Sequence, residues 1–192
     1  MADTYLSQLA IADLIKTYEK DPTPENVINM VQGLVDYAFY PKDKWAIKQF
    51  ADKEKNHHNY FVMKEGDNGK TLHTIIKISL DPTAAYDNQW DLLMPMLDNA
   101  PMATGRCWGI LVRGLKVRLY EYHRDEPKSY RMVTCDFKIG NKSTHSVNIR
   151  KDPKVFQTVL RRIPTYLPEP WDDALTDRTK VNTTSEASTG RP

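Results

Sequence analysis

The stretch HTIIKISLD, residues 73–81, alternates as a β-strand with two different faces does. Successive side chains of a strand point to opposite faces of a sheet. One face therefore carries Ile76, Ile78 and Leu80. The other, more polar face carries Ile75, Lys77, Ser79 and Asp81. The alternation predicts that Lys77 lies in the middle of a solvent-facing strand surface, which makes that surface the first candidate for a functional site.

Two helices are predicted in residues 1–44, where apolar residues recur at helical spacing. The first covers residues 4–20 and ends before Pro22, because proline disfavours helical backbone in the residue that precedes it. The second begins at Thr23, a good N-cap residue, and extends to about Phe39. Residues 1–44 are therefore expected to pack as helices on a core.

A core of strands and helices is expected over residues 45–165. Its predicted elements are a helical piece at 45–50, strands at 59–65 and 73–81 joined by the turn GDNG (66–69), a short helix within 87–100 kinked or shortened by Pro95, strand runs within 107–125 and 130–139, and a helix over 152–163. This order predicts an α/β (α+β) fold with a mixed central sheet flanked by helices. The polar residues 166–192 are expected to form a disordered tail.

Composition predicts a soluble intracellular protein, cytoplasmic or nuclear, with no membrane partner. The 27 basic and 25 acidic side chains give a net charge of +2, which is no strong signal for nucleic acid but leaves room for a local basic face. We find no secretory pattern and no apolar run long enough to cross a membrane. Cys107 and Cys135 have no metal spacing and are expected to be buried thiols; His57, His58 and His73 are expected to be ordinary polar residues.

Short strings in the second half of the chain resemble a known family. Gln89 opens the predicted helix, and the strings WGILVRG (108–114) and VRLY (117–120) follow it. Together with the order of elements over residues 45–163, these strings resemble the restriction-endonuclease-like superfamily, the PD-(D/E)xK nucleases. The resemblance is to the branch that contains fungal relatives and the N-terminal nuclease domains of type I restriction subunits.

The resemblance implies a metal-dependent active site of which this chain keeps one part. In the family, an Asp and the Glu of an ExK motif hold Mg²⁺, and the Lys acts on the phosphate or the water. The positions that match are Asn59 for the Asp, Ile75 for the Glu and Lys77 for the Lys. Only the lysine is present, so the resemblance implies a pseudo-nuclease with no cofactor.

An active enzyme is the first alternative, in which other carboxylates have replaced the missing ones. Glu65 or Asp67, together with Asp81 or Asp91, would then hold Mg²⁺ beside a catalytic Lys77. The protein would in that case be a DNA or RNA nuclease.

A second surface combines basic and aromatic residues. Lys116, Arg118 and Tyr120 share one strand face. Such a face suits a nucleic-acid backbone with stacked bases, or equally an exposed sheet surface with long side-chain stems. The full set of predicted nucleic-acid contacts is Lys77, Arg113, Lys116, Arg118, Tyr120 and Arg131. The expected function is binding of DNA or RNA, or of a protein partner; the alternative is a protein-only interaction module in a fungal defence, incompatibility or selfish-element system.

Overall fold

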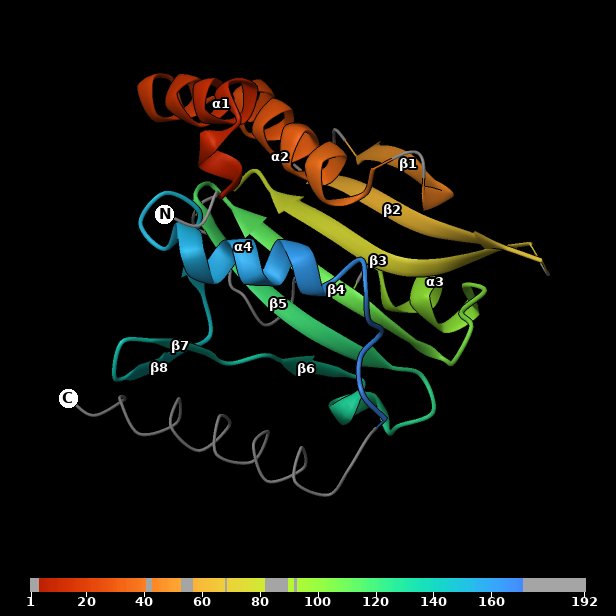
Figure 1. Cartoon of the computed structure of the whole chain (residues 1–192). Helices are drawn as coiled ribbons and strands as arrows, with labels where there is room; N and C mark the ends of the chain where they lie inside the picture. Colours follow the sequence, from red (N-terminus) through yellow and green to blue (C-terminus); the bar gives the residue numbers. More distant parts are fainter. Residues whose placement is uncertain are drawn as a thin grey trace.

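A mixed sheet forms the centre of the protein in its computed structural model, which describes residues 4–40, 43–52, 57–67, 69–81, 90–91 and 93–170 (Figure 1). The sheet follows the order β1-β2-β3-β4-β5-β6, and β9 pairs with β5 beside β6. Its strands are β1 (Trp45–Asp52), β2 (His57–Gly66), β3 (Gly69–Ser79), β4 (Arg106–Arg113), β5 (Lys116–His123), β6 (Met132–Thr134) and β9 (Val147–Asn148). Strands β7 (Phe137–Ile139) and β8 (Lys142–Thr144) form a separate hairpin.

Strands β3 and β4 are parallel, whereas every other described neighbouring pair in the sheet is antiparallel. The connection from β3 to β4 contains α3 (Met94–Asn99). Parallel strands bring their carboxyl ends to one edge of the sheet. Residues at the ends of β3 and β4 therefore meet, although more than thirty residues separate them along the chain.

Three helices cover one face of the sheet: α1 (Leu9–Lys20), α2 (Pro24–Ala38) and α4 (Pro153–Arg162) (Figure 1). Their apolar sides and the inward residues of the strands form one core cluster, which we call the helix-side core. The predicted N-cap is confirmed, because the Thr23 hydroxyl accepts a hydrogen bond from the backbone N–H of Asn26 at 3.3 Å. The short 3-10 turn η1 (Tyr5–Ser7) precedes α1 and contacts α4.

The opposite face carries a smaller core cluster, which we call the α3-side core. It contains Ile75 from β3, Leu111 from β4, and Trp90 and Leu97 from the connection to β4. Trp90 packs across the strands, with its ring centroid 5.2 Å from that of Tyr120. The mixed α/β fold with helices on both sides of the sheet, which the sequence predicts, is confirmed.

One prediction of secondary structure is wrong. Residues 45–50 are not helical but belong to β1, which pairs with β2 from Trp45↔Lys64 to Asp52↔His57. Tertiary pairing of this kind overrides a weak local helical pattern. Within 87–100, the described residues form the short helix α3, which has Pro95 in its first turn, so of the two expected effects of this proline the structure shows a short helix and not a kink in its interior. Gln89 lies outside the described residues.

The chain after α4 is bound to the sheet through residue 170. Trp108 Nε1 donates to the Tyr166 carbonyl at 2.6 Å, and Arg106 Nη1 donates to the Pro168 carbonyl at 2.8 Å. These first residues of the segment that the sequence assigned to a disordered tail therefore lie on β4, while residues 171–192 lie outside the described part. No helix within the described ranges is long and apolar enough to span a membrane.

Candidate functional site

Lys77 lies in a row of side chains that crosses four strands. Its partner on β2 is Asn59, and its partner on the parallel strand β4 is Leu111. Leu111 is in turn paired with Arg118 on β5. Because directly paired residues of a sheet point to the same face, all four side chains lie on the face of the α3-side core.

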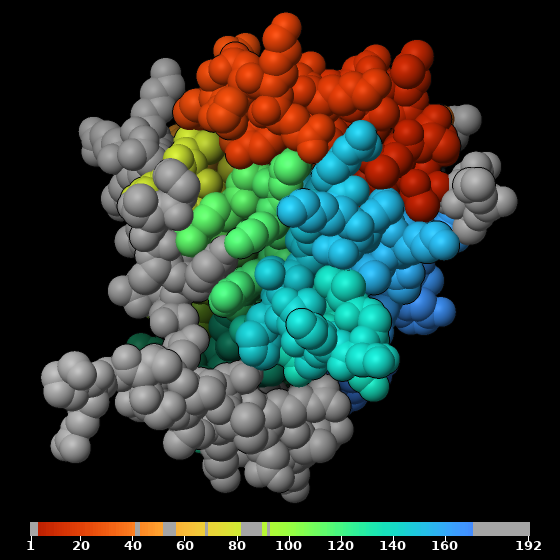
Figure 2. Space-filling view, turned by 90° about the vertical axis from the view of Figure 1, so that its left-hand side faces the viewer, coloured from red at the N-terminus to blue at the C-terminus, as the bar shows by residue number. Residues whose placement is uncertain are grey.

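Three further residues extend this row at the carboxyl ends of β3 and β4. Ile78 pairs with Val112, so Ser79 and Arg113, the next residues of these strands, lie at the same level. Arg113 is paired with Lys116 across the tight turn at Gly114, whose φ is +56°. Figure 2 looks onto this end of the sheet, where the turn between β4 and β5 lies beside the red and orange helices α1 and α2. We call Lys77, Arg113, Lys116 and Arg118 the cationic corner.

The surface around Lys77 is not solvent-facing, contrary to the prediction from alternation. Lys77 is only 1% exposed, and its neighbours Asn59 and Ser79 are 4% and 3% exposed. The alternation itself is real, but this face does not face solvent because it carries the α3-side core, which includes Trp90, Leu93 and Leu97. The basic side chains of this face that reach solvent are Lys116, which is exposed, and Arg113 and Arg118, which are half-buried.

The structure does not bring Glu65 and Asp67 to Lys77. Asn59 is the β2 residue opposite Lys77, and Glu65 lies six residues farther along the strand. At about 3.3 Å per residue this separation is about 20 Å. Glu65 instead pairs with Lys70 at the hairpin, where Oε1 and Nζ are 3.9 Å apart. Asp67 lies in the turn that follows.

The other two candidate carboxylates lie elsewhere along the connection from β3. Asp81 follows the end of β3, and its carbonyl accepts a hydrogen bond from the Ser79 hydroxyl at 3.1 Å. Asp91 is exposed beside Trp90. Within the described ranges, no group of three or more His, Cys, Asp or Glu side chains is arranged to hold a metal ion.

The residues at the positions that the resemblance assigns to metal binding do not fit a divalent cation. Ile75, at the position of the motif's glutamate, has no ligating atom and is fully buried in the α3-side core. Asn59 offers only a neutral amide oxygen, whereas Mg²⁺ prefers carboxylate oxygens. We therefore derive no chemical step through a metal at this position.

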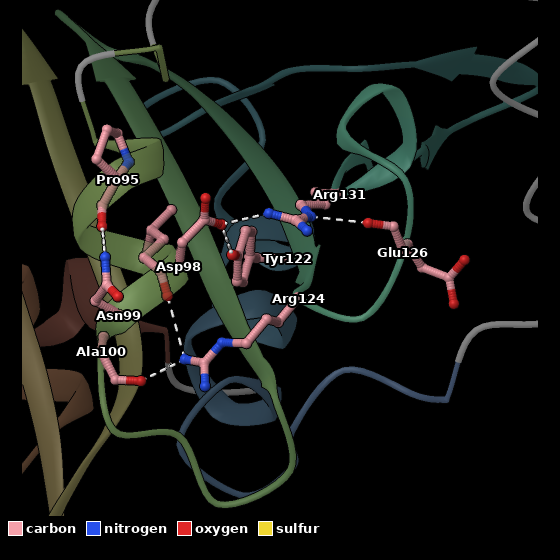
Figure 3. Close-up of polar contacts among 9 residues, drawn as sticks. Pro95, Asp98, Asn99, Ala100, Tyr122, Arg124, Glu126 and Arg131 are labelled. Atoms are coloured by element: carbon pink, nitrogen blue, oxygen red, sulfur yellow. Dashed lines mark hydrogen bonds and ion pairs between the residues drawn. The ribbon is translucent and has the colours of Figure 1, made fainter.

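Two predicted contacts, Tyr120 and Arg131, serve the fold at their observed positions. Tyr120 is 5% exposed and packs edge-on against Trp90, so its ring is not presented to a base. Arg131 Nη1 contacts Asp98 Oδ1 at 2.7 Å, and its Nε donates to the Glu126 carbonyl at 2.8 Å (Figure 3).

Asp98 links α3 to the sheet through a second bond as well. The Tyr122 hydroxyl donates to the same Asp98 oxygen at 2.6 Å, and the pKa of Asp98 is lowered, first by this hydrogen bond and also by Arg131. Arg124 donates to the carbonyls of Leu97 and Ala100 at the end of α3 (Figure 3). These contacts fix α3 on the sheet.

The histidines and cysteines of the chain do not assemble a described site either. His57 and His58 begin β2 rather than lying in a loop. His73 packs against Trp45 with ring centroids 4.9 Å apart, and burial together with Lys64 lowers its pKa to about 4. Burial raises the pKa values of both Cys107 and Cys135, which makes these thiols poor nucleophiles.

Two members of the site, Asn59 and Ser79, were not among the predicted binding residues. Their signal is present in the sequence, because both lie on the strand face of Lys77 once β2 and β3 are paired. A comparison of the chain with protein-family models, with curated proteins and with solved structures gives no match.

Proposed function

We propose that this domain binds the phosphate backbone of DNA or RNA at the cationic corner without hydrolysing it. The observation that carries the proposal is the gathering of Arg113, Lys116 and Arg118 on one face, at the edge where β3 and β4 both end. Nucleic-acid affinity that does not depend on sequence comes mainly from Lys and Arg contacts with phosphates. A protein with this activity would work in the nucleus or the cytoplasm.

The spacing of the three outer charges supports contact with consecutive phosphates. Lys116 and Arg118 are two residues apart on one strand face, which separates their Cα atoms by about 7 Å. Arg113 lies directly opposite Lys116. Lys77 lies on the same face, where it pairs with Leu111 on the neighbouring strand. The protein would contact the sugar-phosphate backbone and would not stack on the bases, because the Tyr120 ring is buried in the core.

The absence of hydrolysis in the proposal rests on the residues that replace the family's ligands. Ile75 and Asn59 supply no carboxylate, and Glu65 and Asp67 lie at the far end of the β2–β3 hairpin. On the family resemblance, the domain would be a pseudo-nuclease that keeps only the lysine of the motif.

The test is a fluorescence-anisotropy titration of labelled single-stranded and duplex DNA and of RNA with the wild type and with Arg118→Ala. We expect measurable binding by the wild type and a several-fold weaker affinity for the variant. Arg161→Ala, a substitution on the exposed side of α4, is the matched control and should leave affinity unchanged. Equal affinities of wild type and Arg118→Ala, or no binding at low salt, would contradict the proposal, and Mg²⁺-dependent cleavage that is lost in Lys77→Ala would show an active nuclease instead.

A protein partner is a second candidate function, favoured by an apolar surface at the β1 edge of the same face. Phe50 on the edge strand β1 is 53% exposed, and Met96 on α3 is 46% exposed. They line a shallow hollow together with Phe61, Met63 and Leu72. Exposed apolar surface beside an open strand edge is typical of protein interaction sites. Retention of a co-purifying protein by the wild type, and its loss in Phe50→Ser but not in Arg118→Ala, would favour this function.

A further inference from the structure

The outer edge of strand β1 is open within the described part of the chain. Strand β1 is the last strand in the order of the sheet, and β2 is the one described strand that pairs with it (Figure 1). Every second residue of such an edge strand directs its N–H and C=O groups away from the sheet, where they can pair with another strand. Proteins commonly protect an edge with proline, a bulge or charged residues. Strand β1 has no proline, its register with β2 is unbroken from Trp45 to Asp52, and Lys48 is the one charged residue between these ends.

The apolar hollow on the α3 side of the sheet lies directly beside this edge. It has a volume of about 330 Å³, and its lining includes Lys48 and Phe50 of β1, Met63 of β2, Leu72 of β3 and Met96 of α3. Paired residues of a sheet point to the same face, so a strand added to β1 would place side chains opposite Lys48 and Phe50, at the open side of the hollow. An extended strand is therefore the occupant that satisfies both the open backbone edge and the apolar surface.

We propose that this strand is β1 of a second copy of the protein, paired antiparallel about a twofold axis perpendicular to the sheet. The inference rests on the second candidate function, a protein partner at this apolar surface, and names that partner. The axis passes Gln49, which pairs with Gln49 of the second copy. Lys48 of each copy then pairs with Phe50 of the other, on the face of the hollow.

The sequence of β1 selects this register. A strand that pairs antiparallel with its own copy about such an axis is centred on one residue, because paired residues share a face. Centring on Lys48 would place two lysines directly opposite each other, and like charges in this position are destabilising. Centring on Phe50 would pair only residues 48–52, whereas centring on Gln49 pairs residues 46–52. At Gln49, the exposed Phe50 ring of each copy covers the aliphatic stem of Lys48 of the other, and symmetry makes this contact twice.

The oligomeric state of the full-length protein tests the proposal. Analytical ultracentrifugation over a range of protein concentrations should show a monomer–dimer equilibrium for the wild type. Phe50→Lys places lysines opposite each other at both symmetric pairs, so it should weaken association about tenfold or more. The double variant Lys48→Glu/Phe50→Lys should restore association, because each lysine then faces a glutamate. Leu9→Lys, the same kind of exchange at an exposed residue of α1, is the control and should associate as the wild type does.

The outcomes separate this inference from the candidate function on which it rests. A monomer at every concentration would overturn the inference, as would a dimer that Phe50→Lys leaves intact or one that the double variant fails to restore. A monomeric protein that loses a co-purifying protein in Phe50→Ser would still have a protein partner at this surface, so the candidate function would stand while the second copy would be excluded.

Disulfide trapping tests the register independently. Directly paired residues of antiparallel strands have Cα atoms about 4.5–5.5 Å apart, within the range of about 4.4–6.8 Å that a disulfide spans. Under copper-catalysed oxidation by air, Gln49→Cys should form a covalent dimer that a reducing agent separates, and Lys16→Cys, at an exposed position of α1, should not. The wild type, with its native Cys107 and Cys135, gives the background. No covalent dimer in Gln49→Cys, or equal amounts in the two variants, would contradict the proposed pairing.

Discussion

Lys77 on β3 and Arg118 on β5 are both paired with Leu111 on β4, which lies between them. Strand β3 runs parallel to β4, and β5 runs antiparallel to it. Lys77 and Arg118 are separated by 41 positions in the sequence but lie in one row on one face of the sheet. The two side chains differ in exposure, since Lys77 is buried and Arg118 reaches the surface in part. Lys77 and the outer charges of the cationic corner therefore lie on one face of the sheet.

The resemblance to PD-(D/E)xK nucleases predicts that two substitutions restore a metal site. Asn59 on β2 is paired with Lys77 on β3. Ile75 lies two residues before Lys77 on the same face, so Asn59 and Ile75 are diagonal neighbours, about 7–8 Å apart. Carboxylates at both positions could reach one cation, given metal–oxygen distances of about 2.0–2.6 Å. We expect Mn²⁺ to raise the Tm of Asn59→Asp/Ile75→Glu but not of either single variant. If Mn²⁺ changes none of the three Tm values, the match of Asn59 and Ile75 to the metal-binding positions of these nucleases would be contradicted.

Gly109 in the middle of β4 is expected to be intolerant of a methyl group. A Cβ there would lie 3.2 Å from the Trp90 ring and 3.3 Å from Tyr120 Cβ, inside a packed part of the α3-side core. We expect Gly109→Ala to lower the free energy of unfolding by about 1–3 kcal/mol in urea denaturation. Gly66→Ala is the control, because its Cβ would meet only the Gly69 carbonyl at 3.8 Å. Equal effects of the two substitutions would show that Trp90 does not pack on this strand.

The hydrogen bonds of Asp98 anchor α3 to the sheet, and we expect them to contribute to the free energy of unfolding. Asp98 accepts hydrogen bonds from Tyr122 and Arg131 while remaining partly exposed. We expect Asp98→Asn and Tyr122→Phe each to lower the free energy of unfolding by about 1 kcal/mol, with less than additive effects in the double variant. Because the pKa of Asp98 is lowered in the folded protein, its contribution is present above the ordinary value of 3.8 and is lost at lower pH. Full additivity would show that the two groups do not interact.

Stability should decline below neutral pH because of His73. Burial, with the nearby Lys64, lowers the pKa of His73 from 6.5 to about 4. Between these values the unfolded chain binds a proton that the folded protein does not. The free energy of unfolding therefore falls as pH falls from 6.5 to about 4, by at most about 3 kcal/mol.

Urea denaturation of the wild type and His73→Gln from pH 8 to pH 4 measures this contribution. The variant should show a flatter dependence on pH. His58, whose pKa burial also lowers, is present in both proteins, so the difference reports on His73 alone. Parallel pH profiles of the two proteins would contradict the assignment.

The sequence predicts the helices and the inner strands of this fold well, for identifiable reasons. Thr23 with Pro24 marks the start of α2, and Asp152-Pro153 marks the start of α4, because capping and proline geometry act locally. Strand β1 is missed because eight residues with apolar groups at mixed spacing become a strand only by pairing with β2.

The candidate site is predicted in part only. Alternation places Lys77, Ser79 and Ile75 on one face of β3, and pairing confirms it. The burial of Lys77 is not predictable from the strand alone, since it depends on what packs on that face in the folded protein. The same is true of Tyr120, whose core position is set by Trp90.

The salt dependence of nucleic-acid binding tests the central claim most directly. Each phosphate contact contributes about 0.9 to the slope of log K against log salt concentration on duplex DNA. We predict that the wild type binds a random-sequence duplex with a clear negative slope. The triple variant Arg113→Ala/Lys116→Ala/Arg118→Ala should bind more weakly, with a slope smaller in magnitude by about 2 to 3. An unchanged affinity and slope in the triple variant would contradict the claim that the cationic corner is the binding surface.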